Sequence, residues 1–414
     1  AALTLDESKL PPVNRFLIGD LDTTKDACAD LGSFANSKWL AANAIPSDRT
    51  SWGAFEMLDE RSTAVQRQLA EQAATRANAS GTEKIVGDLW ATGMDEAKIN
   101  AQGIDPIKGH LAAIDALADK DAIADYLRSS AAKGQNFLFG FGALPEFSNP
   151  NMNTAVAVQG GLGLPDKNYY FDADKKDLRD AYLAHIGKML ELSGVASADA
   201  AKQAADVMAF ETRLAKVSKS NEDFSRDVNL YNNMVSFADA DKLTPNFSWT
   251  RFFESQGVSG IEKFSLATPD FHQEVSAMLG DTDPAVWRSY LRFHTVDGAA
   301  PYLSDAFANE RFNFYNNKLS GQKEIEARWK RVLGTIEGQA GEALGQMYVK
   351  VAFSPESKAK METLVANLGA ALKDRIQGLE WMSDETKAKA QEKQAAFTTK
   401  IGYPDKWREW SGLA

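Results

Sequence analysis

Apolar residues recur every three or four positions along most of the chain, the spacing that places them on one face of a helix. The pattern changes between 136 and 158, where two short apolar runs, 137–141 and 154–158, flank polar residues. Runs of this kind are typical of strands, and we expect a two-stranded ribbon. The sequence therefore predicts a mainly α fold with a small β-ribbon. The predicted helices lie at 52–73, within 83–133, and at 178–190, 207–217, 284–294, 355–379 and 384–397.

One of these helices carries a nearly unbroken apolar stripe. It follows Ser354-Pro355, a capping residue and a proline that together predict a helix start. Such a stripe is typical of a helix that faces a hydrophobic core, and we expect it to be buried. Its members are Met361, Leu364, Val365, Leu368, Leu372, Ile376 and Leu379.

The stretch 160–170 combines three glycines, a proline and two tyrosines. Glycines permit backbone conformations and close approaches that a side chain would forbid, and Pro165 disfavours a continuous helix. A phosphate-binding loop is the alternative, but neither G-x-G-x-x-G nor G-x-x-x-x-G-K-[ST] is present. The stretch is therefore interpreted as a buried turn that leads into a core-facing helix.

Composition narrows the classes of protein that fit. A chain of 414 residues is long enough for two or three lobes. The net charge of −11, without a long basic run, argues against a nucleic-acid partner, and no apolar stretch approaches the length of a membrane span. Cys28 is the only cysteine, so no internal disulfide can form, and we expect this thiol to be buried.

Known catalytic motifs are missing from the sequence. None of the four histidines lies in H-E-x-x-H, and no G-x-S-x-G nucleophile motif is present. His185 and His294 lie beside apolar stripes, where a hydrogen-bonded structural histidine is expected rather than a metal ligand. Taken alone, the residues indicate a mainly helical protein with no complete active site.

Several blocks of the chain match the motifs of one known family in the same order. They are 26–40 (motif D-x-C-x-D-F-Y-x-Y-A-N-G-x-W), 159–170 (Q-G-G-L-G-L-P-D-x-x-Y-Y), 226–232 (R-D-x-x-x-Y-N), 328–330 and 343–349 (R-W and L-G-x-x-Y-V), and 400–407 (K-I-G-Y-P-D-x-W). In these blocks the sequence resembles the neprilysin-like zinc endopeptidases, the family of neprilysin and the endothelin-converting enzymes. The similarity extends over almost the whole chain.

The resemblance implies a zinc endopeptidase that cleaves peptides of modest size. In the family, the H-E-x-x-H helix and the other zinc and catalytic residues lie beyond the K-I-G-Y-P-D-x-W block. No catalytic or metal residue is therefore assigned in this chain. Zinc is expected to be bound by a C-terminal catalytic half, which we expect to be a separate chain. Trp407 and Trp410 are expected to be buried against that half.

The family fold has a helical lobe that caps a thermolysin-like catalytic lobe. By resemblance, residues 1–45 form an arm that packs on the catalytic lobe, 46–353 form the cap that limits substrate size, and 354–414 return to the catalytic lobe. The catalytic lobe itself would be completed by a missing or separate chain.

The resemblance also implies a substrate-binding segment. Phe55 and Glu56 fall on positions that line the subsite beyond the scissile bond. The two arginines that bind a substrate's free carboxylate in neprilysin fall on Ser51 and Asp59, which favours internal cleavage. Arg49 is close enough in sequence to replace one of these guanidinium groups.

Two further expectations concern the compartment and a rival function. Asn36 stands where vertebrate relatives have the cysteine partner of Cys28, as in bacterial members of the family. The N-terminus lacks the features of a secretory signal, so we expect either a periplasmic or secreted protein whose signal has been removed, or a cytoplasmic protein.

The alternative to an enzyme is a catalytically inactive helical module that binds peptides.

Overall fold

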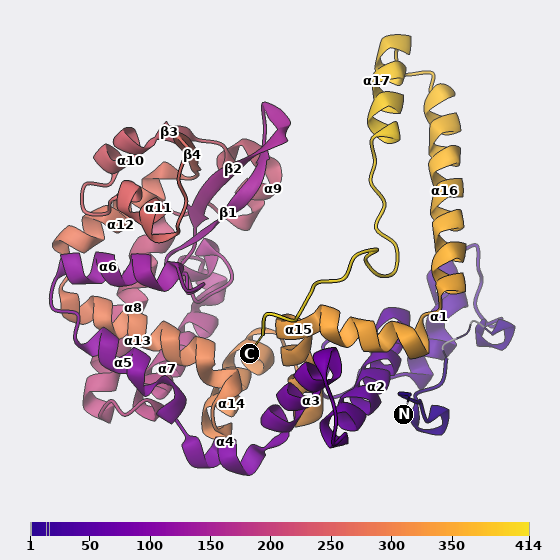
Figure 1. Ribbon diagram of the computed structural model, residues 1–414, viewed down its shortest axis with the longest axis horizontal. Helices are drawn as coiled ribbons and strands as arrows, with labels where there is room; N and C mark the ends of the chain where they lie inside the picture. The colour runs from indigo at the N-terminus through magenta and orange to yellow at the C-terminus, as the bar shows by residue number, and fades with distance from the viewer. Residues whose placement is uncertain (1, 14, 16, 414) are drawn as a thin grey trace. The chain divides into compact units, whose positions relative to one another are not determined.

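The computed structural model describes residues 2–13, 15 and 17–413, and it is mainly helical with one small sheet (Figure 1). The chain divides into two compact units. Unit 1 combines the chain up to Glu96 with 326–414, and unit 2 comprises 97–325. The lobe boundaries predicted from the family resemblance, at residues 45/46 and 353/354, refer to complete family members and not to these compact units. They stay a prediction.

Unit 1 has a core formed by three helices, α2, α3 and α15, which pack around Leu69, Trp90 and Leu333. Helix α16 begins after Ser354, whose hydroxyl accepts the N–H of Ser357, so the predicted helix start is confirmed. Helix α17 returns beside α16 (Figure 1). The helices are α1 (Leu31–Ala42), α2 (Ala54–Thr75), α3 (Gly81–Met94), α15 (Arg328–Ala352), α16 (Pro355–Gln377) and α17 (Asp384–Ala395), with short 3-10 turns η1 (Glu7–Lys9) and η2 (Ile18–Asp20).

The apolar stripe on α16 is not buried, so this prediction is wrong for most of its members. Met361, Leu364, Leu368 and Leu372 are exposed, and Ile376 is the buried member. Helix α17 contacts α16 through a hydrogen bond from Gln394 to the Gly369 carbonyl, but it leaves the stripe in solvent. Amphipathic spacing shows which residues share a face, and it does not show whether a second layer covers that face.

The two tryptophans near the end of the chain have partners within unit 1. Trp410 packs against the core of α2, α3 and α15. The Trp407 ring stacks on Tyr403 with 5.7 Å between ring centroids, and it lies 3.4 Å from the position that a Cβ would take at Gly345 of α15. Both indoles are therefore partly covered within unit 1, and their burial against a C-terminal half stays a prediction.

The burial expected for Cys28 is wrong, since its side chain is exposed.

Unit 2 is a larger helical body with its own core. Its helices include α7, α8 and α13, which confirm the predictions over 178–190, 207–217 and 284–294. Asp283 caps α13 by accepting the N–H of Ala285. The elements are α4 (Glu96–Gln102), α5 (Lys108–Asp115), α6 (Lys120–Ala131), α7 (Lys176–Leu192), α8 (Ser197–Val217), α9 (Asn221–Arg226), α10 (Phe237–Leu243), α11 (Trp249–Ser255), α12 (Pro269–Asp281), α13 (Pro284–Ala299), α14 (Asp305–Arg311) and the π-helical η8 (Phe312–Leu319), with 3-10 turns η3 (Asp105–Ile107), η4 (Lys167–Tyr170), η5 (Ala173–Lys175), η6 (Val228–Tyr231) and η7 (Ala300–Tyr302).

The predicted ribbon is part of a four-stranded sheet. Strands β1 (Phe139–Glu146) and β2 (Asn149–Gln159) pair antiparallel, as expected. Strand β4 (Lys263–Leu266) pairs parallel to β2, and β3 (Met234–Ser236) pairs antiparallel to β4. These two strands are three and four residues long, too short for an alternating pattern to stand out in the sequence.

The glycine-rich turn after β2 packs around one buried carboxylate, that of Glu211 on α8. The hydroxyls of Tyr170 and Tyr182 donate to it at 2.6 and 2.9 Å, and His294 Nε2 lies 2.7 Å away. The backbone N–H of Gly163 donates at 3.2 Å. Because Glu211 is fully buried, these donors replace the water that its charge would otherwise need. The turn leads into the core-facing helix α7, as predicted, but it is only partly buried: Leu164 and Tyr170 are buried, and the glycines are partly exposed.

His185 on α7 lies between two carboxylates from other elements. Its Nε2 is 2.8 Å from Asp297 of α13, and its Nδ1 is 3.1 Å from Glu310 of α14. Tyr315 of η8 packs edge-on against the imidazole ring. Both ring nitrogens face acceptors, so the arrangement suits the doubly protonated imidazolium. The predictions that His185 and His294 are hydrogen-bonded structural histidines are confirmed.

The contacts of His185 with Asp297 and Glu310 predict that the stability of unit 2 depends on pH. Burial opposes the charge on His185, but the hydrogen bonds to Asp297 and Glu310 outweigh burial and raise its pKa above the ordinary value of 6.5. The stabilisation is therefore fully present below pH 6.5 and is lost as the pH rises through the raised pKa. Urea unfolding between pH 5.5 and 8.5 should show stability falling over this range, and the fall should be smaller in His185→Gln. Equal slopes in the two proteins would contradict the assignment.

Candidate functional site

The predicted substrate-binding residues lie at the start of α2 in unit 1. Gly53 precedes the first turn of this helix, which contains Phe55 and Glu56. Phe55 is 85% exposed, a large fraction for a phenyl ring. The ring is therefore free to contact a peptide or another polypeptide.

Glu56 is held in place by a neighbouring side chain. The hydroxyl of Ser51 donates to its carboxylate at 2.7 Å. This hydrogen bond lowers the pKa of Glu56 below the ordinary value of 4.5, so the carboxylate is charged at neutral pH. The resemblance places one of the two neprilysin arginines on Ser51. In this chain Ser51 instead fixes the Glu56 carboxylate and brings no positive charge.

Arg49 belongs to a cluster of five charged residues with Asp48, Asp59, Glu60 and Lys330. Its guanidinium lies 2.7 Å from Asp59 and 2.8 Å from Glu60. Lys330 of α15 lies 2.9 Å from Asp48 and 2.7 Å from Glu60. Burial opposes the charge of Lys330, but the bonds to Glu60 and Asp48 outweigh it and raise its pKa. The cluster joins the segment before α2 to α15.

These contacts define what Arg49 can do. Its guanidinium is already paired, so a substrate carboxylate would have to compete with Asp59, the more exposed of the two partners. Asp59 is the second position on which the resemblance places an arginine of neprilysin, and here it is the partner of Arg49. The structure places Arg49, Phe55 and Glu56 on one continuous segment. Their role in substrate binding stays a prediction.

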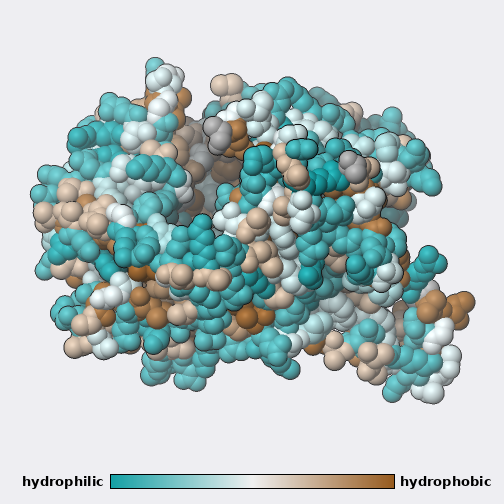
Figure 2. Space-filling view, turned by 60° about the horizontal axis from the view of Figure 1, so that its bottom comes forward, coloured by the Kyte–Doolittle hydropathy of each residue, from teal (hydrophilic) through white to brown (hydrophobic). Residues whose placement is uncertain are grey.

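Exposed apolar side chains are the feature of unit 1 that the sequence patterns did not reveal. Besides the α16 stripe, Leu31 and Leu40 of α1, Ile45 and Leu58 are exposed. Figure 2 shows hydrophobic residues in separate groups on an otherwise hydrophilic face. Single exposed apolar side chains are ordinary, whereas Met361, Leu364, Leu368 and Leu372 share one helical face and form the candidate contact surface of this unit.

The residues that the structure describes do not fit a zinc centre. In the part of the chain that the structure describes, no group of three or more His, Cys, Asp or Glu residues could hold a metal ion. All four histidines of the sequence belong to unit 2, so unit 1 has none. The imidazoles of His185 and His294 contact carboxylates, and His272 Nε2 lies 3.0 Å from the Ala267 carbonyl.

Among the described helices, none has the length and apolar character needed to cross a membrane.

Comparison of the sequence with known proteins gives one family and several relatives. The sequence model of peptidase family M13 matches residues 27–404. Mouse endothelin-converting enzyme 1 is 27% identical over 408 residues, which cover 95% of this chain and 52% of that protein. Rat endothelin-converting enzyme-like 1 is 28% identical over 409 residues, which cover 94% of this chain and 52% of that protein. The chain therefore spans about half the length of the curated relatives it matches.

Solved structures give the same result at the level of the fold. The zinc metalloprotease Zmp1 of Mycobacterium tuberculosis, crystallised with an inhibitor, aligns with a TM-score of 0.86 and 31% identity. The alignment covers 96% of this chain and 60% of Zmp1. PepO from Lactobacillus rhamnosis HN001 aligns with a TM-score of 0.82 at 22% identity, a likeness of fold alone.

Proposed function

Because the chain belongs to peptidase family M13, we propose that it forms the N-terminal, substrate-gating part of a zinc-dependent endopeptidase. The match over residues 27–404 carries this proposal. Zinc and the catalytic residues are assigned to a C-terminal catalytic part, since the described residues of this chain offer no metal-binding group. Peptides of modest size are the proposed substrates, and residues 46–353 form the proposed gate that limits their size.

The exposed stripe on α16 is the proposed contact with the catalytic part. Met361, Leu364, Leu368 and Leu372 share one helical face and remain in solvent. Removing apolar surface from water is favourable by about 25 cal/mol for each Å², before the entropic cost of association is subtracted. A catalytic part that packs on this face therefore accounts for a stripe that unit 1 itself leaves uncovered.

The proposal is tested on the protein isolated from its source. We expect an H-E-x-x-H sequence, in the same polypeptide or in a second one, and about one zinc ion per molecule. Removing zinc with a chelator should abolish peptide cleavage, and adding zinc should restore it. Undiminished cleavage after complete zinc removal would contradict the proposal. A lone 45.2 kDa species without zinc that binds peptides would instead identify an inactive binding module.

Phe55→Ala is predicted to change the selectivity of the complete enzyme for the residue after the cleaved bond. Since the Phe55 ring is 85% exposed, its removal should alter the thermal unfolding temperature little. Cleavage maps of a peptide library provide the measurement. Phe397→Ala, at another exposed phenylalanine of unit 1, is the matched control. Identical maps for wild type and Phe55→Ala would exclude Phe55 from the subsite.

A further inference from the structure

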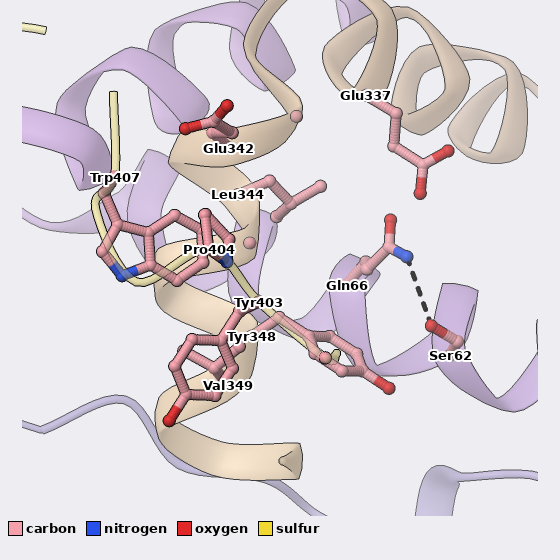
Figure 3. Close-up of a pocket in the computed structure, with 13 residues that line it drawn as sticks. Ser62, Gln66, Glu337, Glu342, Leu344, Tyr348, Val349, Tyr403, Pro404 and Trp407 are labelled. Carbon is pink, nitrogen blue, oxygen red and sulfur yellow. Dashed lines mark hydrogen bonds between the residues drawn. The ribbon is translucent and has the colours of Figure 1, made fainter. Parts of the chain in front are cut away.

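A cavity of about 290 Å³ in unit 1 lies between α2, α15 and residues 402–407 (Figure 3). The carboxylates of Glu337 and Glu342 that line it are exposed, and the ammonium of Lys358 already lies 4.4 Å from the centroid of the Tyr403 ring. These side chains are served by solvent and by each other, so they need no ligand. In unit 2, by contrast, the free edge of the sheet presents backbone groups that a ligand can pair.

Strand β1 forms one edge of the four-stranded sheet, and among the described residues β2 is the only strand beside it. The carbonyl of Ala157 in β2 accepts the N–H of Ala267, so the backbone groups of Ala157 face β4. Phe141 of β1 is opposite Ala157 in the register. In an antiparallel ladder, a residue opposite one that faces away belongs to a non-hydrogen-bonded pair and also faces away. The N–H and C=O of Phe141 therefore point outward from the sheet.

The outward groups recur along the edge. Every second residue of a strand directs its backbone groups to the same side, so those of Ala143 and Pro145 also point outward. A proline at position 145 agrees with this, since proline in a sheet occurs where its missing N–H would face solvent. Ala143 is exposed and Phe141 is partly exposed. Within the described parts of the chain, no hydrogen bond reaches the outward groups of these two residues.

The aromatic core of unit 2 holds this edge in place. The ring of Phe141 packs edge-on against Phe252 and Phe253, with centroids 5.0 and 5.3 Å apart. The opposite face of β1 carries Gly140 and Gly142, and a Cβ at Gly142 would meet no atom within 4 Å. An added strand therefore finds room for its own side chains on this face. The edge is already extended, so it loses little conformational freedom when it pairs.

We propose that β1 binds an extended peptide as an additional strand, which hydrogen-bonds to the outward backbone groups of Phe141 and Ala143. In strand addition the main chain supplies the affinity, so peptides of varied sequence can bind. Leu144, Phe147 and Met152 of the same hairpin are exposed and offer apolar contacts to side chains of the peptide. That this peptide is a substrate rests on the proposed function.

The length of the free edge favours a short peptide over a second copy of the chain. Pro145 offers no N–H, and the register shifts between Pro145 and Glu146, so regular pairing is limited to the residues before Pro145. Pairing of two such short edges would bury far less than the ~1,000 Å² expected of a stable interface between proteins. A peptide of a few residues matches this length.

Fluorescence anisotropy with the full chain tests the proposal. The probe is a fluorescein-labelled peptide of alternating threonine and valine, with two terminal lysines for solubility. We expect it to bind, and we expect the same peptide N-methylated on its backbone amides to bind weaker by about tenfold or more, because it has lost its donors. Absence of binding, or equal binding of the two probes, would overturn the proposal. Zinc and cleavage take no part in this measurement, so its failure would leave the proposed peptidase function untouched.

Two proline substitutions locate the site. Ala143→Pro removes an outward N–H and spares the bonds between β1 and β2, so it should weaken binding of the probe by about tenfold. Asn153→Pro is the matched control, because Asn153 of β2 is opposite Pro145 and its N–H points away from β1. Binding to this variant, and to Ala143→Val, should equal that of the wild type.

Circular dichroism verifies that the variants are folded, and the comparison of the two probes uses only the wild-type protein, so it decides even if a variant does not fold. Unaltered binding to folded Ala143→Pro would overturn the proposal. Analytical ultracentrifugation examines the other occupant. Self-association of the wild type that Ala143→Pro abolishes would show that a second copy occupies the edge, and it would also overturn the proposal.

Discussion

Replacing Gly163 by alanine is expected to lower the free energy of unfolding of unit 2 by about 2–4 kcal/mol. A Cβ at this position would lie 1.8 Å from the hydroxyl oxygen of Tyr182 and 2.6 Å from its Cζ. Tyr182 is fully buried and bonded to Glu211, so its ring has no free space to move into. The added methyl group must displace either the turn or the tyrosine, and both movements disturb the hydrogen bonds to Glu211.

Chemical denaturation of the variant and the wild type measures this loss. Gly109→Ala is the matched control, because a Cβ at Gly109 of α5 would meet no atom within 4 Å. Alanine is the better helix former, so the control should be neutral or slightly stabilised. If Gly163→Ala were as stable as the control, the turn would have to be looser than the close contact with Tyr182 implies.

Local signals were sufficient to predict most helices. The helix starts at Asp283-Pro284 and Ser354-Pro355 depend on a cap and a proline adjacent in sequence, and both caps form as expected. Strands β3 and β4 could not be predicted in this way. Each is short, and its pairing joins residues that lie far apart in the chain, such as Val156 of β2 and Ser265 of β4. The exposure of the α16 stripe depends on whether another element covers it, and the spacing of apolar residues carries no information about that.

The candidate site was predicted only through the family resemblance. Nothing local distinguishes Phe55 from an ordinary core phenylalanine, and its exposure is a property of the folded unit. The pairing of Arg49 with Asp59 crosses ten residues and depends on how the segment before α2 turns back on the helix. Glu211 did leave a signal. It falls four residues after Val207 and three before Leu214, so it is a carboxylate on the apolar face of α8.

Glu211→Gln, which conserves shape and removes charge, is expected to destabilise unit 2 by about 3–5 kcal/mol. The carboxylate accepts from both tyrosine hydroxyls, from Gly163 and from His294. An amide replaces one acceptor oxygen by an NH₂ group, which then faces groups that are themselves donors. Because the site is buried, water cannot compensate for the lost bonds.

The matched control for this prediction is Glu222→Gln, at an exposed carboxylate of the same unit that pairs with Arg226. Exposed pairs contribute at most about 1 kcal/mol, so this variant should unfold close to the wild type. Urea denaturation of Glu211→Gln, Tyr170→Phe and the double variant then separates the tyrosine contact from the rest. The two losses should not be additive, since removing the Tyr170 hydroxyl matters less once its charged acceptor has been replaced by an amide with a single acceptor oxygen. Additive losses, or a Glu211→Gln protein as stable as the control, would show that Glu211 does not hold the turn, α7 and α13 together.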